Sequence, residues 1–222
     1  VEKNGCWDFE VISASTGRFF RDLEKLPDAE KKSLPVWDGE LLMTSHGAGA
    51  YTSRAMNKRL NAQNENIADR TEKLCVAADC AGVFKYPAEN LEKAWKRVIQ
   101  HQFHDDITGT GNMDVVCDAQ NDYFISLSEF KTELAAAGGA LANETDTEWV
   151  TECAVIVSNP SAHKRRGAIQ AHIKLQHNST FIKVLDKHGN ETPSQVVKKS
   201  GKEFDILFIA DVEALGLKVY DV

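Results

Sequence analysis

The chain has 222 residues, and its 26 basic and 33 acidic residues give a formal net charge of −7. With 42% apolar residues it can bury a core as one large or two small domains, which excludes a disordered chain. The acidic balance argues against a nucleic-acid partner, and no apolar run reaches the ~18 residues of a membrane span. Because the chain begins at Val1 without a signal peptide, we expect a fragment or a processed piece.

Residues 1–36 are predicted to contain one short helix, across Thr16–Lys25. Thr16 is a suitable N-cap, and Pro27 and Pro35 mark the exit from the helix. The apolar residues that share one face of this helix are Phe19, Phe20 and Leu23.

Three longer helices are predicted between about residue 50 and residue 137. The first has apolar residues at three-, four- or seven-residue steps, namely Met56, Leu60, Ile67, Leu74 and Ala78. Its charged residues are expected to face water, and these are Arg54, Lys58, Arg59, Asp69, Arg70 and Glu72.

The second of these helices begins near Pro87, a residue favoured at the first helical position. One stripe of this helix is lined by Leu91, Trp95, Val98 and Gln102, with Ala94 and Ile99 beside it. The third helix covers roughly Met113–Ala137, where apolar residues follow a near-heptad spacing. Three helices with short connections, each apolar on one stripe, predict a three-helix bundle.

The small, polar stretch 138–148 is predicted to be a linker or a domain seam. After it, the spacing of the apolar residues changes to every second residue. Ala168–Leu175 alternates strictly, and similar short runs continue to Val222. Five or six strands are expected, fewer than the roughly seven of a complete sandwich. The predicted fold class is therefore α+β, a three-helix bundle followed by an antiparallel β-sandwich-type segment that begins a further domain.

The five cysteines lack the spacing of a zinc finger, since no C-x-x-C is present. Most have small apolar neighbours, so we expect small core residues rather than a disulfide framework. These cysteines are Cys6, Cys75, Cys80, Cys117 and Cys153.

The densest group of chemically capable residues is H-Q-F-H-D-D-I-T-G-T-G at positions 101–111. His101 and His104 are three residues apart, which on a helix would place them on one face, and Asp105 and Asp106 follow. Imidazole and carboxylate suit a divalent metal, but this group supplies at most two good ligands, whereas zinc takes three or four. The alternative is a solvated helix C-terminus, where a protonated histidine complements the helix dipole.

A second candidate is the loop T-S-H-G-A-G-A-Y-T-S at positions 44–53, which is rich in small and polar residues and contains His46 and Tyr51. The alternative is a plain helix-entry loop. The remaining histidines fall in the β region and are expected to be exposed: His163, His172, His177 and His188. No G-x-S-x-G, P-loop or dinucleotide motif occurs.

Three stretches of the chain resemble, in order, segments of the class II α-mannosidases of glycoside hydrolase family 38. The first, Leu34–Arg59, contains W-D-G-E-L and H-G-A-G-A-Y-T-S and is similar to the family's W-x-G-E-L-Y and H-x-G-T-Y-T-S segments. The second, Tyr86–Thr110, ends in Q-F-H-D-D-I-T-G-T, like the family's Q-[FH]-H-D-x-[IL]-x-G-[TS]. The third, V-I-V-S-N-P at Val155–Pro160, is similar to the V-x-V-x-N-P that opens the family's C-terminal β region.

The resemblance implies a retaining glycosidase that hydrolyses terminal α-mannosides and carries one zinc ion. By the family's motif, His104 would be a zinc ligand and Asp105 would contact the bound mannose. Phe103, before the ligand, suggests the bacterial branch and hence the bacterial cytoplasm or periplasm. Asp106 departs from the Ala or Ile found there in the family, so the resemblance assigns it no role.

The loop residues are implied to lie near the substrate, and these are Glu40, His46 and Tyr51. Gly47 departs from the family here, since the family has Arg or a similar residue after the histidine.

The resemblance also implies a division of the chain. Residues 1–35 would be the tail of an N-terminal catalytic α/β domain, 36–140 the helical middle domain, and 141–222 the start of the C-terminal β-sandwich domain. No catalytic residue is expected in this fragment, because the nucleophile and the acid/base would lie in the N-terminal domain of the same parent chain. The isolated fragment should then be inactive, and its partners would be that domain and a mannose-containing glycan, with no nucleic acid and no membrane.

Two other functions stay open on the sequence alone. One is a non-catalytic helical and β scaffold, or a carbohydrate-binding module. The other is a free-standing metal protein that uses the local group His101, His104, Asp105 and Asp106.

Overall fold

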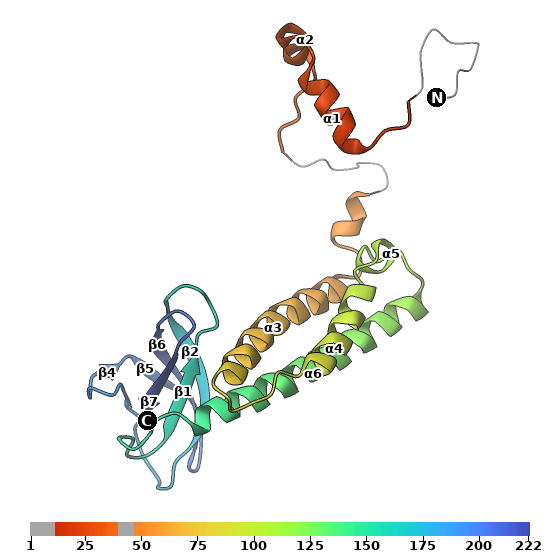
Figure 1. Ribbon diagram of the computed structural model, residues 1–222. Coiled ribbons are helices and arrows are strands. Elements are labelled where there is room, and N and C mark those ends of the chain that lie inside the picture. The colour runs from red at the N-terminus through yellow and green to blue at the C-terminus, as the bar shows by residue number, and fades with distance from the viewer. Residues whose placement is uncertain (1–11, 40–46) are drawn as a thin grey trace, which may run out of the picture. The chain divides into compact units, whose positions relative to one another are not determined.

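A computed structural model describes residues 12–39 and 47–222 (Figure 1). The chain divides into two units, Val1–Ala48 and Gly49–Val222. Within the described ranges, no helix is both long enough and apolar enough to cross a membrane.

In the part of the first unit that the structure describes, the chain forms two short helices, α1 (Thr16–Glu24) and α2 (Asp28–Ser33). The prediction of a helix at Thr16–Lys25 is confirmed, although the N-cap is Ser15 rather than Thr16. Neither helix buries a residue, and the rings of Phe19 and Phe20 meet edge to face with both side chains exposed. These helices therefore have an apolar face without a core of their own.

The second unit begins with a bundle of three long helices, as predicted. They are α3 (Ala55–Cys80), α4 (Ala88–Gln100) and α6 (Met113–Asn143), and they lie side by side in Figure 1. A 3₁₀ turn, η1 (Ala48–Tyr51), precedes α3, and the single turn α5 (His104–Ile107) joins α4 to α6.

Helix α6 extends six residues beyond its predicted end at Ala137, so the predicted linker at 138–148 is wrong in its first half. The helix was predicted to end before Gly138 and Gly139, but it continues through both. A Cβ at Gly138 would lie 3.3 Å from Leu74 Cδ2, so this glycine allows close packing of α6 against α3. Helix packing here outweighs the poor helix propensity of the Gly-Gly pair.

The buried face of α3 differs from the predicted apolar stripe. Leu60 and Ala78 are buried as expected, but Met56 is 47% exposed. Three polar residues, each seven positions from the next, lie in the interface instead, and these are Asn57, Asn64 and Thr71.

The polar residues in this interface are hydrogen-bonded to α6. Asn64 Nδ2 donates to the carbonyls of Leu60 and Tyr123, at 2.9 and 3.0 Å, and Thr71 Oγ1 donates to that of Phe130 at 3.1 Å. Asn57 Oδ1 accepts a hydrogen bond from Gln120. Each of the three residues thus has a hydrogen-bond partner on α6, which offsets the cost of its burial, although Asn64 Oδ1 is buried without a partner.

Apolar packing fills the remainder of the bundle. Leu91, Ala94 and Val98 of α4 are buried against α3 and α6, and the ring of Trp95 meets Phe130 edge to face at 5.6 Å. The indole Nε1 of Trp95 donates to Glu72 at 2.8 Å. Glu72, expected to face water, therefore lies half-buried beside α4.

The chain after α6 is all β. Seven strands form within the described residues, one or two more than expected, and two of them are only two residues long. They are β1 (Ala154–Ser158), β2 (Arg165–Lys174), β3 (Val184–Leu185), β4 (Glu191–Thr192), β5 (Ser194–Ser200), β6 (Glu203–Val212) and β7 (Leu217–Asp221). All pairings are antiparallel, in the orders β1-β7-β3-β4 and β2-β6-β5. The α+β fold class is thus confirmed.

The core of the β segment is shared by both sheets. Strand β6 alternates along its whole length, and its buried residues Phe204, Ile206 and Phe208 pack with Val184 and Tyr220 of the other sheet. Buried and less buried residues thus alternate along β6, which is the two-residue hydrophobic period predicted from the sequence.

Two buried polar side chains fix the ends of this β segment. Asp221 accepts hydrogen bonds from the N–H and hydroxyl of Thr151, at 3.0 and 2.6 Å, and from the N–H of Glu152. Asn159, from the V-I-V-S-N-P stretch, donates to the carbonyls of His163, Val212 and Glu213.

The cysteine prediction holds for only some residues. Cys75 is buried and Cys153 is half-buried, but Cys80 and Cys117 are exposed on the outer faces of α3 and α6. All four are free thiols, and Cys6 lies outside the described residues.

Candidate functional site

The strongest candidate residues lie on α5. Helix α4 ends at Gln100, and a new turn begins at His104, so the prediction that His101 and His104 share a helix face is wrong. His104 is exposed over 75% of its side chain, with Nε2 3.6 Å from Asp105 Oδ2, and its ring lies 4.2 Å from that of Phe103. An accessible imidazole beside an accessible carboxylate can meet a ligand brought by another molecule or domain.

The backbone after α5 folds into a tight turn that requires glycine. Gly109 has φ +78°, and a Cβ there would lie 2.7 Å from Arg54 Cγ and 2.9 Å from the Ser53 carbonyl. The turn therefore approaches the start of α3 too closely for any side chain. The N–H groups of Thr110 and Gly111 both donate to the Asp105 carbonyl at 3.2 Å, which closes the turn.

Threonine hydroxyls complete the turn. Thr108 donates to the carbonyl of His104, and Thr110 to the Asp105 carbonyl at 3.2 Å and its carboxylate at 3.3 Å. The I-T-G-T stretch thus holds the backbone of the two candidate residues.

Lys58 ties the turn to the first helix of the bundle. Its ammonium group donates to the carbonyls of Ser53, Ile107 (2.9 Å) and Thr108 (3.4 Å). Burial lowers the pKa of Lys58 below its ordinary value. The prediction that this lysine faces water is therefore wrong, because it neutralises the carbonyl end of α5.

His101 is buried rather than exposed. Its Nδ1 lies 2.8 Å from Asp106 Oδ2 and its Nε2 3.1 Å from Asp122 Oδ2, while its carbonyl accepts from the Tyr123 hydroxyl at 3.1 Å. Burial, assisted by the charges of Asp106 and Glu65, raises the pKa of Tyr123 to about 12, so its hydroxyl stays a donor. Sequence reasoning missed Asp122, because no local spacing connects α6 to His101.

The structure describes only part of the second candidate loop. Glu40 and His46 lie outside the described residues. Tyr51 ends η1 with its side chain exposed. The implied substrate contacts of these three residues stay predictions.

The described donor atoms fit zinc only as a contributed ligand. Across residues 12–39 and 47–222, no group of three or more His, Cys, Asp or Glu side chains could hold a metal ion. His104 and Asp105 offer two accessible donors, whereas His101 and Asp106 are engaged with each other. Because zinc takes three or four ligands, the arrangement suits a site completed from elsewhere more than a free-standing metal centre.

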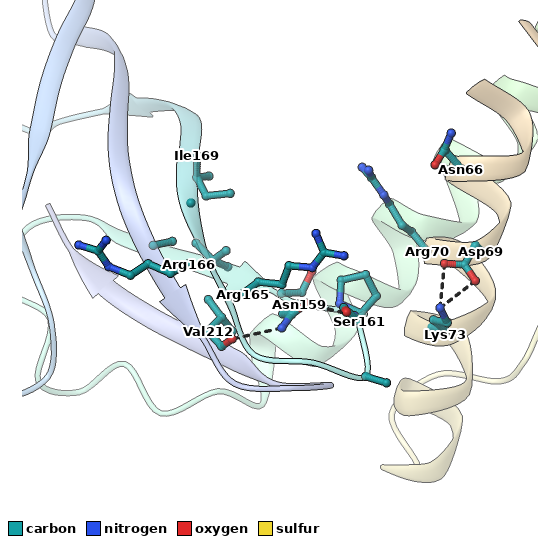
Figure 2. A pocket seen from close by; sticks show the side chains of 16 residues that line it. Asn66, Asp69, Arg70, Lys73, Asn159, Ser161, Arg165, Arg166, Ile169 and Val212 are labelled. Atoms are coloured by element: carbon teal, nitrogen blue, oxygen red, sulfur yellow. Dashed lines mark hydrogen bonds and ion pairs between the residues drawn. The ribbon is translucent and has the colours of Figure 1, made fainter. Parts of the chain in front are cut away.

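A separate cavity lies between α3 and the β segment (Figure 2). It has a volume of about 520 Å³, and Arg70 and Arg165 line it from opposite sides. Asn159 contributes to its wall, fixed by its bond to the Val212 carbonyl. No predicted site residue lines this cavity, so it is distinct from the α5 turn.

Comparison with known proteins identifies relatives of the helical part. Residues 46–141 match the family described as the alpha mannosidase middle domain. The chain is 35% identical over 132 residues to alpha-mannosidase 2C1 of Mus musculus, covering 59% of this chain and 12% of that protein. It is 34% identical over 101 residues to alpha-mannosidase G of Dictyostelium discoideum, covering 46% of this chain and 9% of that protein. The chain thus spans about a tenth of the length of these relatives.

Two solved structures share the fold over nearly the whole chain. An alpha-mannosidase from Enterococcus faecalis V583 superposes with a TM-score of 0.65 at 16% identity, covering 92% of this chain and 28% of that one. A protein in glycosyl hydrolase family 38, also from E. faecalis, gives a TM-score of 0.66 at 16% identity, covering 94% and 28%. The succession of helical bundle and β segment is therefore found in known structures.

Proposed function

We propose a function on the premise that the chain belongs to the family 38 α-mannosidases, whose middle domain it contains. The chain supplies His104 as a zinc ligand and Asp105 as a mannose contact to a retaining enzyme that acts on terminal α-mannosides. The observation that carries the proposal is the accessible His104–Asp105 pair on α5, inside the matched residues 46–141.

A retaining mechanism needs two carboxylates about 5 Å apart, one as nucleophile and one as acid/base. We place both on a catalytic domain of a longer protein that contains this chain. Zinc, when bound, would supply Lewis-acid polarisation and orient sugar hydroxyls. By this proposal the 222-residue chain alone has no hydrolytic activity.

The residues of this chain then have separate tasks. His104 presents a ring nitrogen to the metal, and the Asp105 carboxylate accepts hydrogen bonds from sugar hydroxyls. Lys58, Thr108 and Gly109 hold the backbone beneath them, so that neither group needs to be ordered when the ligand arrives. Glu40, His46 and Tyr51 are proposed as further substrate contacts.

The test uses the longer α-mannosidase that contains this chain, assayed with an aryl α-mannoside. Asp105→Asn keeps the shape of the side chain but removes its charge, so we expect kcat/KM to fall by roughly 100-fold. His172→Ala is the control, because His172 is an exposed histidine of β2 that pairs with Asp205 and lies outside the matched domain. Full activity of Asp105→Asn would contradict the assignment of a mannose contact.

A further inference from the structure

A buried histidine joins α5 to α6. His101 is 4% exposed, and its two ring nitrogens face the Oδ2 atoms of Asp106 on α5 and Asp122 on α6. We name the three residues the His101 bridge. The carboxylates at its two ends are 16% and 30% exposed, so water screens them only in part.

The backbone of His101 is fixed as firmly as its ring. Its carbonyl accepts from the Tyr123 hydroxyl, and the two rings lie 5.6 Å apart. His101 is the C-cap of α4, so one residue meets all three elements at this end of the bundle. Its backbone and one ring nitrogen are therefore held from α6, independently of α5.

Lys58 and the Gly109 turn hold the carbonyl end of α5 against α3, but they do not connect α5 to α6. Helix α5 is a single turn with no buried residue, and its own capping side chain makes no hydrogen bond. An isolated turn of four residues has no intrinsic stability in water, so its direction depends on contacts at its sides. Lys58 binds the carbonyl end of α5. The Asp106 side chain contacts the His101 ring, and this contact connects α5 to α6.

We propose that His101, with Asp106 and Asp122, is a positioning residue that sets the direction in which α5 presents His104 and Asp105. The bridge touches neither metal nor sugar and acts only through the turn. The consequence for zinc rests on the proposed function, whereas the orientation of α5 does not.

The first experiment measures amide hydrogen exchange in the 222-residue chain. Asp106→Ala should speed the exchange of the Ile107, Gly109 and Gly111 amides by roughly tenfold, with less than about a twofold change in the middle of α3. Asp106→Asn should recover most of the protection, since an amide oxygen can accept the same hydrogen bond. Asp118→Ala, an exposed carboxylate one turn before Asp122, is the matched control and should change nothing.

Two results would overturn the bridge as a positioning device. One is unchanged exchange at the three amides in Asp106→Ala. The other is uniform acceleration through α3 and α6, which would indicate a general loss of stability. If Asp106→Ala does not fold, Asp122→Ala gives a second test at the other end of the bridge, with a smaller acceleration at the same amides expected.

The second experiment measures zinc affinity by chelator competition in the longer enzyme. Asp106→Ala should weaken zinc roughly tenfold, the size usual for outer residues that orient a ligand, and Asp106→Asn should restore it. If His104→Ala leaves zinc unchanged while α5 loosens as expected, the proposed function fails and the positioning of α5 stands. If His104→Ala loses zinc but Asp106→Ala changes neither readout, the positioning inference fails alone.

Discussion

The helical bundle and the β segment solve the same packing problem with different side chains. The bundle buries Asn57, Asn64 and Thr71 between α3 and α6. Each of them is hydrogen-bonded to a backbone carbonyl or a side chain of α6. The middle of the sheet core is apolar, as in Phe204 and Phe208, and its polar groups lie at the strand ends.

The difference follows from how each element fixes its register. Paired strands are aligned by their backbone hydrogen bonds, so side chains need only fill the core. Packed helices have no bonds of this kind, and apolar surfaces can slide past one another. Asn64 and Thr71 reach the carbonyls of Tyr123 and Phe130, themselves seven residues apart, and so specify one alignment of α3 on α6.

The largest expected effect concerns the apolar centre of each region. Phe130→Ala in the bundle and Phe208→Ala in the sheet each remove a fully buried ring, and we expect each to lower the free energy of unfolding by about 3 to 5 kcal/mol. Urea denaturation with residue-resolved hydrogen exchange would show which region each variant loosens. Loss of protection confined to the variant's own region would show that the two regions are stabilised separately. Equal loss of protection in both regions would show that they unfold as one cooperative unit.

The second prediction concerns pH. In the bundle, burial raises the pKa of Tyr123 from 10.0 to about 12, so the folded state holds the hydroxyl proton more tightly than the unfolded state. The stability that this contributes is fully present below pH 10 and is lost as the pH rises to 12. The loss is on the order of 2 kcal/mol, and Tyr123→Phe should abolish it. Cys75, whose pKa burial raises to about 11, adds a loss from pH 9 to 11.

The β segment should respond at the opposite end of the pH scale. Burial raises the pKa of Asp221, but its hydrogen bonds from Thr151 and Glu152 outweigh this effect and leave the pKa below its ordinary value. The stability it contributes is present above about pH 4 and lost as the pH falls. Hydrogen exchange at pH 3 and pH 10.5 should therefore loosen different regions, and loosening of one region at both extremes would contradict this assignment.

The third prediction separates backbone strain from crowding. Gly109 and Gly189 have similar backbone angles, φ +78° and +76°, but a Cβ is crowded only at Gly109. We expect Gly189→Ala to cost about 1 kcal/mol and Gly109→Ala about 2 kcal/mol, measured by thermal unfolding. Equal costs would show that the turn after α5 can move away from α3.

The smallest effect tests the register argument itself. Asn64 and Asn66 both donate to a carbonyl four residues earlier, but only the buried Asn64 also reaches α6. Asn64→Ala should lower stability by about 1 to 2 kcal/mol and Asn66→Ala by less than about 0.5 kcal/mol in urea titrations. Equal losses of stability in the two variants would show that the hydrogen bond to the Tyr123 carbonyl does not fix the alignment of α3 on α6.

Periodicity alone was sufficient for the three helices and for the alternation of β2 and β6. It failed where a residue's partner is distant in the chain. Asn57 and Lys58 look like surface residues by type, and only packed helices bring Gln120 and Ile107 to them. The predicted helix ended before Gly138, because Leu74, which packs on this glycine, is 64 positions earlier.

The candidate site shows the same limit. His104 and Asp105 were predicted from a local motif, and the structure places them together on an exposed turn. His101 was expected beside them, but burial and two carboxylates from different helices give it another role. A motif thus indicates chemistry within a few residues, whereas the support beneath it depends on the tertiary fold.

Zinc retained after extensive dialysis shows whether His104 is one ligand of a site completed outside this chain. We expect one zinc per molecule of the proposed longer enzyme, its loss in His104→Ala but not in His172→Ala, and almost none in the 222-residue chain. Stoichiometric zinc in the isolated chain, or in the longer enzyme carrying His104→Ala, would contradict this expectation.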